Sequence, residues 1–298
     1  MQPILLFGPN GQIGWELQRT LAPLGPVAAL NRKDLDLANH QAIRSAINDL
    51  KPRLIVNAAA YTAVDKAETE SEAAMAVNAT AVGVMAEEAK RIDSALVHYS
   101  TDYVFDGRIS QPRRESDSVA PANAYGRTKL AGENAIIGSG CQAYLIFRTC
   151  WVYADRGSNF LRTIQRLAGE RDELRVVDDQ LGSPTWARLI AETTAQVLAM
   201  TQHQSGWATL AERGGIYHLA ADGICSWFDF ARAIVAATPR NDGTLARVLP
   251  IPSSDYPTPA ARPAYSVLDT SALQSAFGLR LPDWQQGLAL CLSTAART

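Results

Sequence analysis

The feature that most constrains the fold of this chain is a short apolar run followed at once by three evenly spaced glycines. Ile4–Phe7 has the composition of a buried strand, and the segment FGPNGQIG places Gly8, Gly11 and Gly14 at the start of a helical pattern. Glycines allow a tight turn, and the first N–H groups of a helix can hold a pyrophosphate. The spacing is GxxGxxG instead of the commoner GxGxxG, so a plain glycine-rich turn is the competing interpretation. Its position between a strand and a helix favours nucleotide binding.

Apolar runs alternate with helical patterns through the first half of the chain. The runs that predict strands are residues 4–7, 27–30, 54–56, 95–97 and 144–147. Long helices are predicted over residues 71–91 and 125–137. Strands that alternate with helices predict right-handed crossovers and a doubly wound parallel Rossmann sheet, which is an α/β fold.

The pattern becomes less regular after residue 150. Helices are predicted over 159–169, 185–200 and 226–237, strands over 174–177 and 216–219, and little regular structure over 249–263. We therefore expect residues 1–150 to form an NAD(P)-binding Rossmann domain. Residues 151–298 should form mainly a second, smaller α/β substrate domain, with some elements around residues 185–220 returning to the first.

Composition disfavours several classes of protein. The 298 residues carry a net charge of −2, so no general attraction to nucleic acid or to an anionic membrane is expected. No apolar run approaches the ~20 residues of a membrane span, and no secretory leader precedes the first strand, so a cytoplasmic protein is expected. Dispersed cysteines and histidines predict reduced thiols and no metal site. They are Cys141, Cys150, Cys225, Cys291, His40, His98, His203 and His218.

The segment AYGRTKLAGE places Tyr125 and Lys129 four residues apart, on one face of a predicted helix. A phenol has an ordinary pKa of about 10, and a neighbouring ammonium lowers it, which suits proton transfer to an alcohol or sugar oxygen. A lone YxxxK is common by chance. Here it follows Thr101, in the segment STDYVFDG after a predicted strand, and the chain also carries the glycine loop. The three features together favour a catalytic set.

The end of the second predicted strand bears on the choice of cofactor. An acidic residue at this point would bind the adenosine 2′-hydroxyl of NAD, but this chain has Asn31, Arg32 and Lys33. The two cations can meet a 2′-phosphate. The prediction is that NADPH is used at least as well as NADH, and solvated turn residues are the competing interpretation.

Six motifs together resemble the extended short-chain dehydrogenase/reductases over essentially the whole chain. They are the glycine loop, NAAAYTAVDKAE, STDYVFDG, YGRTKLAGE, FRTCWVY and YPTPAARP. The resemblance implies an NAD(P)H-dependent oxidoreductase that reduces the C4 ketone of dTDP-4-dehydro-L-rhamnose. That reaction is the last step of dTDP-L-rhamnose synthesis and feeds cell-surface polysaccharide. Mg²⁺ is implied by the resemblance only, since no clustered carboxylates stand out, and both a monomer and a homodimer stay open.

The glycine loop and the resemblance together assign roles to residues. Tyr125 is the proton donor, Lys129 binds the nicotinamide ribose and tunes Tyr125, and Thr101 donates a hydrogen bond to the substrate carbonyl. Cofactor contacts are expected from Gly8, Gly11, Gln12, Ile13, Gly14, Asn31, Arg32, Asp36, Leu37, Ala60, Tyr61, Thr62, Tyr125 and Lys129. Contacts with a sugar-nucleotide substrate are expected from Thr101, Asp102, Trp151, Asn159, Gln180 and Arg262.

Other interpretations stay open at this point. Nucleotide-sugar 4,6-dehydratases of the same superfamily carry Thr-Asp-Glu where this chain has Thr101, Asp102 and Tyr103, which disfavours dehydration. Another nucleotide-sugar reductase or epimerase and a non-catalytic NADP-binding regulatory subunit are the remaining alternatives. Trp151 is also compatible with a core position, Arg262 with a solvated loop, and Asp102 with a turn or a helix cap.

Overall fold

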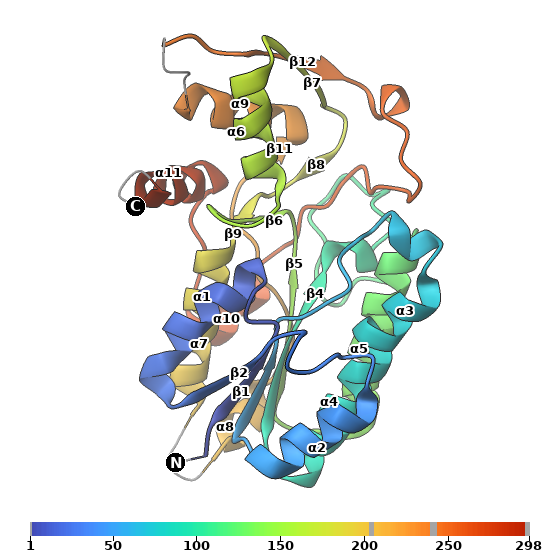
Figure 1. Ribbon diagram of the computed structural model, residues 1–298, viewed down its shortest axis with the longest axis vertical. Helices are drawn as coiled ribbons and strands as arrows, with labels where there is room; N and C mark the ends of the chain where they lie inside the picture. The colour runs from blue at the N-terminus through green and yellow to red at the C-terminus, as the bar shows by residue number, and fades with distance from the viewer. Residues whose placement is uncertain (1, 203–205, 239–242, 296–298) are drawn as a thin grey trace.

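Six parallel strands form the main sheet of the computed structural model, which describes residues 2–202, 206–238 and 243–295 (Figure 1). In spatial order they are β10 (Gly215–His218), β5 (Tyr144–Thr149), β4 (Ala95–Thr101), β3 (Leu54–Asn57), β1 (Ile4–Phe7) and β2 (Val27–Leu30). All neighbouring strands are parallel, so the predicted doubly wound α/β fold is confirmed. His203, one of the histidines dispersed along the sequence, lies outside the described residues.

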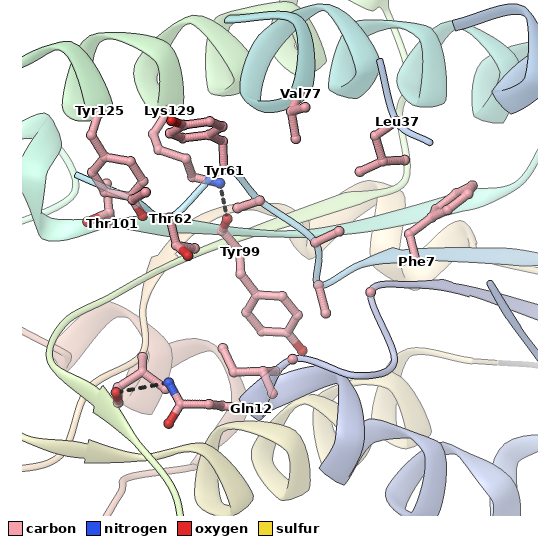
Figure 2. Close-up of a pocket in the computed structure, with 18 of the residues that line it drawn as sticks. Phe7, Gln12, Leu37, Tyr61, Thr62, Val77, Tyr99, Thr101, Tyr125 and Lys129 are labelled. Carbon is pink, nitrogen blue, oxygen red and sulfur yellow. Dashed lines mark hydrogen bonds between the residues drawn. The ribbon is translucent and has the colours of Figure 1, made fainter. Parts of the chain in front are cut away.

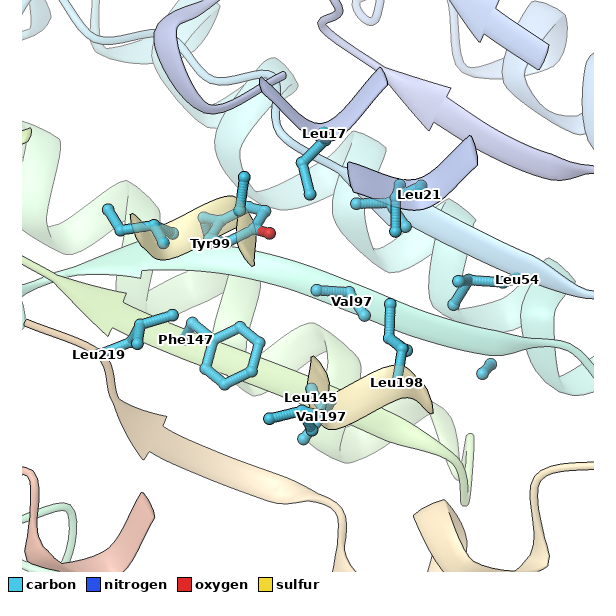
Figure 3. Close-up of a cluster of buried hydrophobic side chains, with 14 of the residues drawn as sticks. Leu17, Leu21, Leu54, Val97, Tyr99, Leu145, Phe147, Val197, Leu198 and Leu219 are labelled. Carbon is cyan, nitrogen blue, oxygen red and sulfur yellow. The ribbon is translucent and has the colours of Figure 1, made fainter. Parts of the chain in front are cut away.

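Helices cover both faces of this sheet (Figure 1). Because successive strand side chains alternate, Ile4 and Leu6 face one core while Leu5 and Phe7 face the other. The first core includes leucines of α1 (Gln12–Leu21) and α7 (Ala187–Thr201), and Figure 3 shows Leu17 and Leu198 among its members. The helices that pack on the main sheet are α1 (Gln12–Leu21), α2 (His40–Leu50), α4 (Ala81–Arg91), α5 (Ala124–Ser139), α7 (Ala187–Thr201), α8 (Ala208–Arg213) and α10 (Ser271–Phe277). Short 3₁₀ turns are η1 (Ala22–Leu24), η2 (Lys66–Glu68), η4 (Asp102–Val104) and η5 (Ser253–Asp255).

The helix predicted over residues 71–91 contains a change of helical type. α3 (Ser71–Met75) passes into a π-helical segment, η3 (Ala76–Thr80), before α4 begins. The buried Asn78 in this segment accepts a hydrogen bond from the Tyr61 N–H at 2.8 Å and donates to the Tyr61 carbonyl at 3.1 Å. The π segment thereby holds the chain that follows β3, as such segments often do near functional sites.

A smaller group of elements lies beyond the carboxyl ends of the main strands (Figure 1). It contains β6 (Val152–Tyr153), α6 (Phe160–Glu170), β7 (Glu173–Val177), β8 (Leu181–Gly182), β9 (Thr185–Trp186), β11 (Cys225–Ser226), α9 (Trp227–Ala237), β12 (Arg247–Ile251) and α11 (Trp284–Ala295). A separate core that includes Tyr153, Phe230 and Trp284 holds it together. The division of the chain into two domains at residue 150 stays a prediction.

Two local predictions in this part were wrong. The segment predicted as a helix from residue 185 starts with Thr185 and Trp186 in strand β9, which pairs with β6, and the helix begins at Ala187. Residues 249–251, predicted to have little regular structure, belong to β12, which pairs in parallel with β7. The pairing partner lies far away in the sequence, so no local pattern announces this strand. None of the helices among the described residues has the length and apolar character needed to span a membrane.

Candidate active site

A cavity of about 1110 Å³ opens at the carboxyl ends of the main strands. Ligands bind at this edge in open parallel α/β sheets. Its wall brings together residues from the glycine loop, the ends of β2 to β5, the start of α5 and the segment between β6 and α6 (Figure 2). The predicted site residues in the wall are Gly8, Gly11, Gln12, Ile13, Asn31, Arg32, Asp36, Leu37, Ala60, Tyr61, Thr62, Thr101, Asp102, Tyr125, Lys129 and Trp151.

The glycine loop has the geometry of a phosphate cradle. Gly8 has a φ of +79°, and a Cβ on it would lie 2.8 Å from Ala59. A Cβ on Gly14 would lie 2.0 Å from the Gly8 carbonyl oxygen, so only glycine lets α1 pack this closely against the loop. Gly14 itself is not part of the cavity wall. α1 begins at Gln12 with no acidic residue in its first turn, so its N-terminal N–H groups can attract an anion. The loop therefore fits a dinucleotide pyrophosphate.

The end of β2 supplies the part of the cavity where the sequence predicts the adenosine. The Asn31 side chain accepts a hydrogen bond from the Lys33 N–H at 2.8 Å, which closes a turn. Arg32 lines the cavity and forms no ion pair among the described residues, whereas Lys33 is exposed and outside the wall. A free guanidinium in this position is suited to a phosphate.

Tyr125 and Thr101 lie side by side in the cavity (Figure 2). Thr101 ends β4, which pairs directly with β5. α5 begins after Asn123, whose side chain accepts a hydrogen bond from the Gly126 N–H at 2.8 Å. A Cβ on Gly126 would lie 2.2 Å from the Tyr103 carbonyl oxygen, so the first turn of α5 packs directly against η4. This close packing brings the phenol of the helix to the end of the strand.

The pKa of Tyr125 is raised, whereas the sequence predicted that Lys129 would lower it. Burial raises this pKa most and the Asp102 carboxyl adds to it, while a hydrogen bond with Thr101 acts in the opposite direction. The Lys129 ammonium is engaged elsewhere: it donates to the Tyr99 carbonyl at 2.6 Å and lies 3.1 Å from His98 Nε2. Tyr125 is therefore a neutral phenol with a proton to give.

Lys129 is held by a buried polar chain that the sequence did not predict. Its side chain is 1 % exposed, and burial lowers its pKa to about 8, with Glu133 acting in the opposite direction. The fully buried His98 contacts Lys129 on one side, and its Nδ1 lies 3.1 Å from Asn57 Nδ2 on the other. Burial first, and the Lys129 charge second, keep the pKa of His98 well below its ordinary value. The imidazole is therefore neutral and orients the lysine without adding charge.

Two stacked tryptophans form the wall of the cavity on the side of the smaller group. The rings of Trp151 and Trp227 lie 3.6 Å apart at 10°, and both line the cavity. Trp151 has a φ of +46°, and a Cβ on Gly182 would lie 2.5 Å from its ring. Trp151 thus packs against core residues and also lines the cavity, and its contact with the substrate stays a prediction.

Three predicted substrate contacts lie outside the cavity wall, and their role stays a prediction. Asn159 caps α6 by accepting from the Arg162 N–H at 3.1 Å. Gln180 donates to Ser253 at 3.0 Å, and Arg262 pairs with Asp65 at 2.8 Å. Of these, the arginine is already neutralised by a partner in this structure.

Several residues of the wall were missed by the sequence reasoning. They are Asn10, Lys66, Tyr99, Ser100, Tyr103, Thr149, Val152, Arg156, Ser158 and Trp227. Those near Thr101 could have been found as neighbours of a predicted site residue. Arg156 and Trp227 belong to the irregular half, where no motif marks them; Arg156 lies over the Trp15 ring at 3.3 Å. Within the described residues, no group of three or more His, Cys, Asp or Glu side chains could hold a metal ion.

The Rossmann sheet, the phosphate cradle and the Tyr125–Lys129 pair at one cavity define an NAD(P)-dependent oxidoreductase of the extended short-chain dehydrogenase/reductase class. A family model described as RmlD substrate binding domain matches residues 1–297. The dTDP-4-dehydrorhamnose reductase of Burkholderia thailandensis is 50 % identical over 293 residues, which cover 97 % of each chain. The chain belongs to the RmlD family of dTDP-4-dehydrorhamnose reductases.

Solved structures of relatives share this fold over their whole length. A dTDP-4-dehydrorhamnose reductase of Clostridium acetobutylicum superposes with a TM-score of 0.90 at 36 % identity, covering 99 % of each chain. The dTDP-4-dehydrorhamnose reductase of Bacillus anthracis, in complex with NADP, gives a TM-score of 0.89 at 33 % identity and covers 98 % of this chain and 99 % of its own.

Proposed function

We propose that this chain reduces the C4 ketone of dTDP-4-dehydro-L-rhamnose to dTDP-L-rhamnose with NADPH, as the final step of dTDP-L-rhamnose synthesis. The observation that carries this proposal is the neutral Tyr125 beside Thr101 in a cavity that also contains the phosphate cradle. Family membership at 50 % identity supports the choice of substrate. A place in the synthesis of cell-surface polysaccharide and a cytoplasmic location stay predictions.

The chain's own residues supply binding, orientation and a proton. The glycine loop would hold the pyrophosphate, and Lys129, fixed by Tyr99 and His98, would hold the ribose next to the nicotinamide. When bound, the reduced nicotinamide supplies the hydride for the C4 carbon. Tyr125 gives its proton to the C4 oxygen as negative charge develops there, and the Thr101 hydroxyl donates a hydrogen bond to the same oxygen. The products are a secondary alcohol and the oxidised cofactor.

The structure also bears on the dehydratase alternative. Tyr103 occupies the position where dehydratases of this superfamily carry Glu, and its ring meets that of Tyr125 edge-on at 5.6 Å. Burial raises the pKa of Tyr103, so it is a neutral phenol and has no carboxylate with which to remove a proton. This observation favours reduction over dehydration. Use of NADPH over NADH, and a monomer or homodimer, belong to the proposal as predictions.

Purified protein tests the proposed reaction directly. NADPH oxidation should be fast with dTDP-4-dehydro-L-rhamnose and slow with other 4-keto-sugar nucleotides, and NMR should identify dTDP-L-rhamnose as the product. Tightly bound cofactor at one equivalent, with no net oxidation of NADPH, would instead indicate an epimerase. Capture of a stoichiometric partner, together with no reductase activity on any 4-keto-sugar nucleotide, would indicate a regulatory subunit.

A further inference from the structure

The hydrogen bonds of Thr101 conflict with the role of its hydroxyl as a donor to substrate. A threonine hydroxyl has one proton to donate. Thr101 Oγ1 accepts from the Tyr103 N–H at 3.2 Å and donates its proton to Asp102 Oδ1 at 3.0 Å. Both side chains are buried, with Thr101 5 % and Asp102 4 % exposed. As long as Asp102 is a carboxylate, the Thr101 proton is committed to it and no donor remains for a substrate oxygen.

The surroundings of Asp102 favour its neutral form. Its second oxygen, Oδ2, is buried without a hydrogen-bond partner among the described residues. Ser266, Thr101 and the backbone N–H groups of Asp102 and Tyr103 lower the pKa of this carboxyl, and burial outweighs them. The titratable groups that face it are Tyr103 on its own turn, Tyr125 on α5 and Cys150 after β5.

The cation near this part of the site does not pair with Asp102. The charge of Arg262 lowers the pKa of Tyr103, and its guanidinium forms an ion pair with Asp65. Burial without a charged partner raises the pKa of Asp102 to about 6. The carboxyl can therefore hold a proton in the range where cytoplasmic enzymes work.

We propose that Asp102 is a positioning residue that must be protonated for reduction: its O–H then donates to Thr101 Oγ1, and the Thr101 hydroxyl turns its own proton toward the substrate oxygen. This inference rests on the proposed function. It assigns to Asp102 control over the direction of one hydrogen bond, in addition to the substrate contact that the sequence predicts. The proton that reaches the substrate still comes from Tyr125, so the balance of the reaction is unchanged.

The pH dependence of kcat/KM at saturating NADPH tests the proposal. In the wild-type protein, kcat/KM should fall by about tenfold for each pH unit above the pKa of Asp102, because only the protonated form leaves Thr101 free. Asp102→Asn carries a permanent donor for Thr101 and no charge. This variant should lose that decline, at the cost of a fall in kcat of up to about tenfold from altered packing. A remaining decline at higher pH belongs to Lys129, whose pKa is about 8.

Two variants of Thr101 provide the matched controls. Thr101→Val removes the donor, so it should lower kcat by about 10²-fold and abolish the decline assigned to Asp102. Thr101→Ser restores a hydroxyl and should restore both the rate and the decline. NADP⁺ affinity, measured by calorimetry for each variant, reports whether the cofactor site is still folded.

The results separate this inference from the proposed function. Wild-type protein could reduce the keto-sugar and yet show no decline of kcat/KM at pH values below the decline that belongs to Lys129. In that case Asp102 does not control Thr101. The same conclusion follows if Asp102→Asn keeps the wild-type decline, or if Thr101→Val keeps it. If the variants do not fold, the wild-type profile alone decides. Wild-type protein that turns over no keto-sugar at all would instead contradict the proposed function.

Discussion

At the scale of single residues, the cavity sets protonation states through burial. Lys129 and Asp102 are buried and Tyr125 is partly buried, and in each case loss of water is the largest influence on the pKa. Burial favours the neutral form of every titratable group. The acid for the reduction is therefore kept protonated by its surroundings, and the cavity does not depend on an ammonium next to the phenol.

Replacement of Tyr125 by Phe tests the proton donor. The phenyl ring keeps the packing, but no proton reaches the C4 oxygen, so kcat should fall by about 10²- to 10⁴-fold while NADP⁺ affinity is retained. Steady-state NADPH oxidation and calorimetry measure the two quantities. Tyr103→Phe, which keeps the edge-on ring contact, should lower kcat far less. Turnover of Tyr125→Phe near the wild-type value would contradict the assignment.

Arg32 tests the choice of cofactor. Arg32→Ala should lower kcat/KM for NADPH by about 10-fold or more relative to NADH, because a charged hydrogen bond to the 2′-phosphate contributes about 1.5–3 kcal/mol. Lys33→Ala is the control, since Lys33 lies outside the cavity wall and should have a smaller effect. An unchanged ratio of kcat/KM values for the two cofactors in Arg32→Ala would overturn the prediction.

At the scale of elements, short strands and helix starts place side chains from distant parts of the chain at the cavity. Gly182 of β8 lies close to the Trp151 ring, and Trp227, the first residue of α9, stacks on that ring. The capping box of Ser226 and Asp229 fixes the start of α9, and this start was predicted from the sequence. Secondary structure thus positions the aromatic wall, although neither element belongs to the Rossmann sheet.

Gly182→Ala tests this aromatic wall. The added Cβ would meet the rigid Trp151 ring at 2.5 Å, so the ring must shift or its stack on Trp227 must open. We expect KM for the sugar nucleotide to rise several-fold, with NADP⁺ affinity unchanged. Gly138→Ala in α5 is the control, because nothing lies within 4 Å of its added Cβ; it should stabilise the protein by about 1 kcal/mol. Equal KM values in the two variants would contradict the prediction.

At the scale of the whole molecule, two imidazoles buried on the main sheet make stability depend on pH. His98 on β4 and His218 on β10 are 0 % exposed. Burial and a neighbouring cation keep the pKa of His98 well below 6.5 and lower that of His218 to about 3. Below about pH 6.5 the unfolded chain binds protons that the folded chain excludes, so stability falls with falling pH.

The free energy of unfolding should therefore fall by on the order of 2 kcal/mol between about pH 6.5 and pH 5. Asp102 acts the other way in part of this range, because its raised pKa lets the folded chain keep a proton that the unfolded chain releases. One carboxyl does not offset two imidazoles. Urea unfolding at several pH values measures the slope, and His218→Gln should reduce it. A slope that is unchanged in His218→Gln would contradict the assignment to this imidazole.

The Rossmann strands, the phosphate loop and the Tyr125–Lys129 pair could all be predicted from the amino-acid sequence. These features depend on local periodicity and spacing, which the order of residues along the chain encodes directly. Thr101 and Trp151 were also predicted, by resemblance, and both line the cavity.

Which other side chains lie beside these residues depends on how the chain folds. Trp227 and Arg156 line the cavity, and Arg262 forms an ion pair with Asp65. β12 is a strand because it pairs with β7. The pKa of Tyr125, raised instead of lowered, and the hydrogen bond that Thr101 donates to Asp102 likewise depend on burial and on contacts between elements. Pairing, burial and charge environment are set by residues far apart in the chain, and no local pattern carries that information.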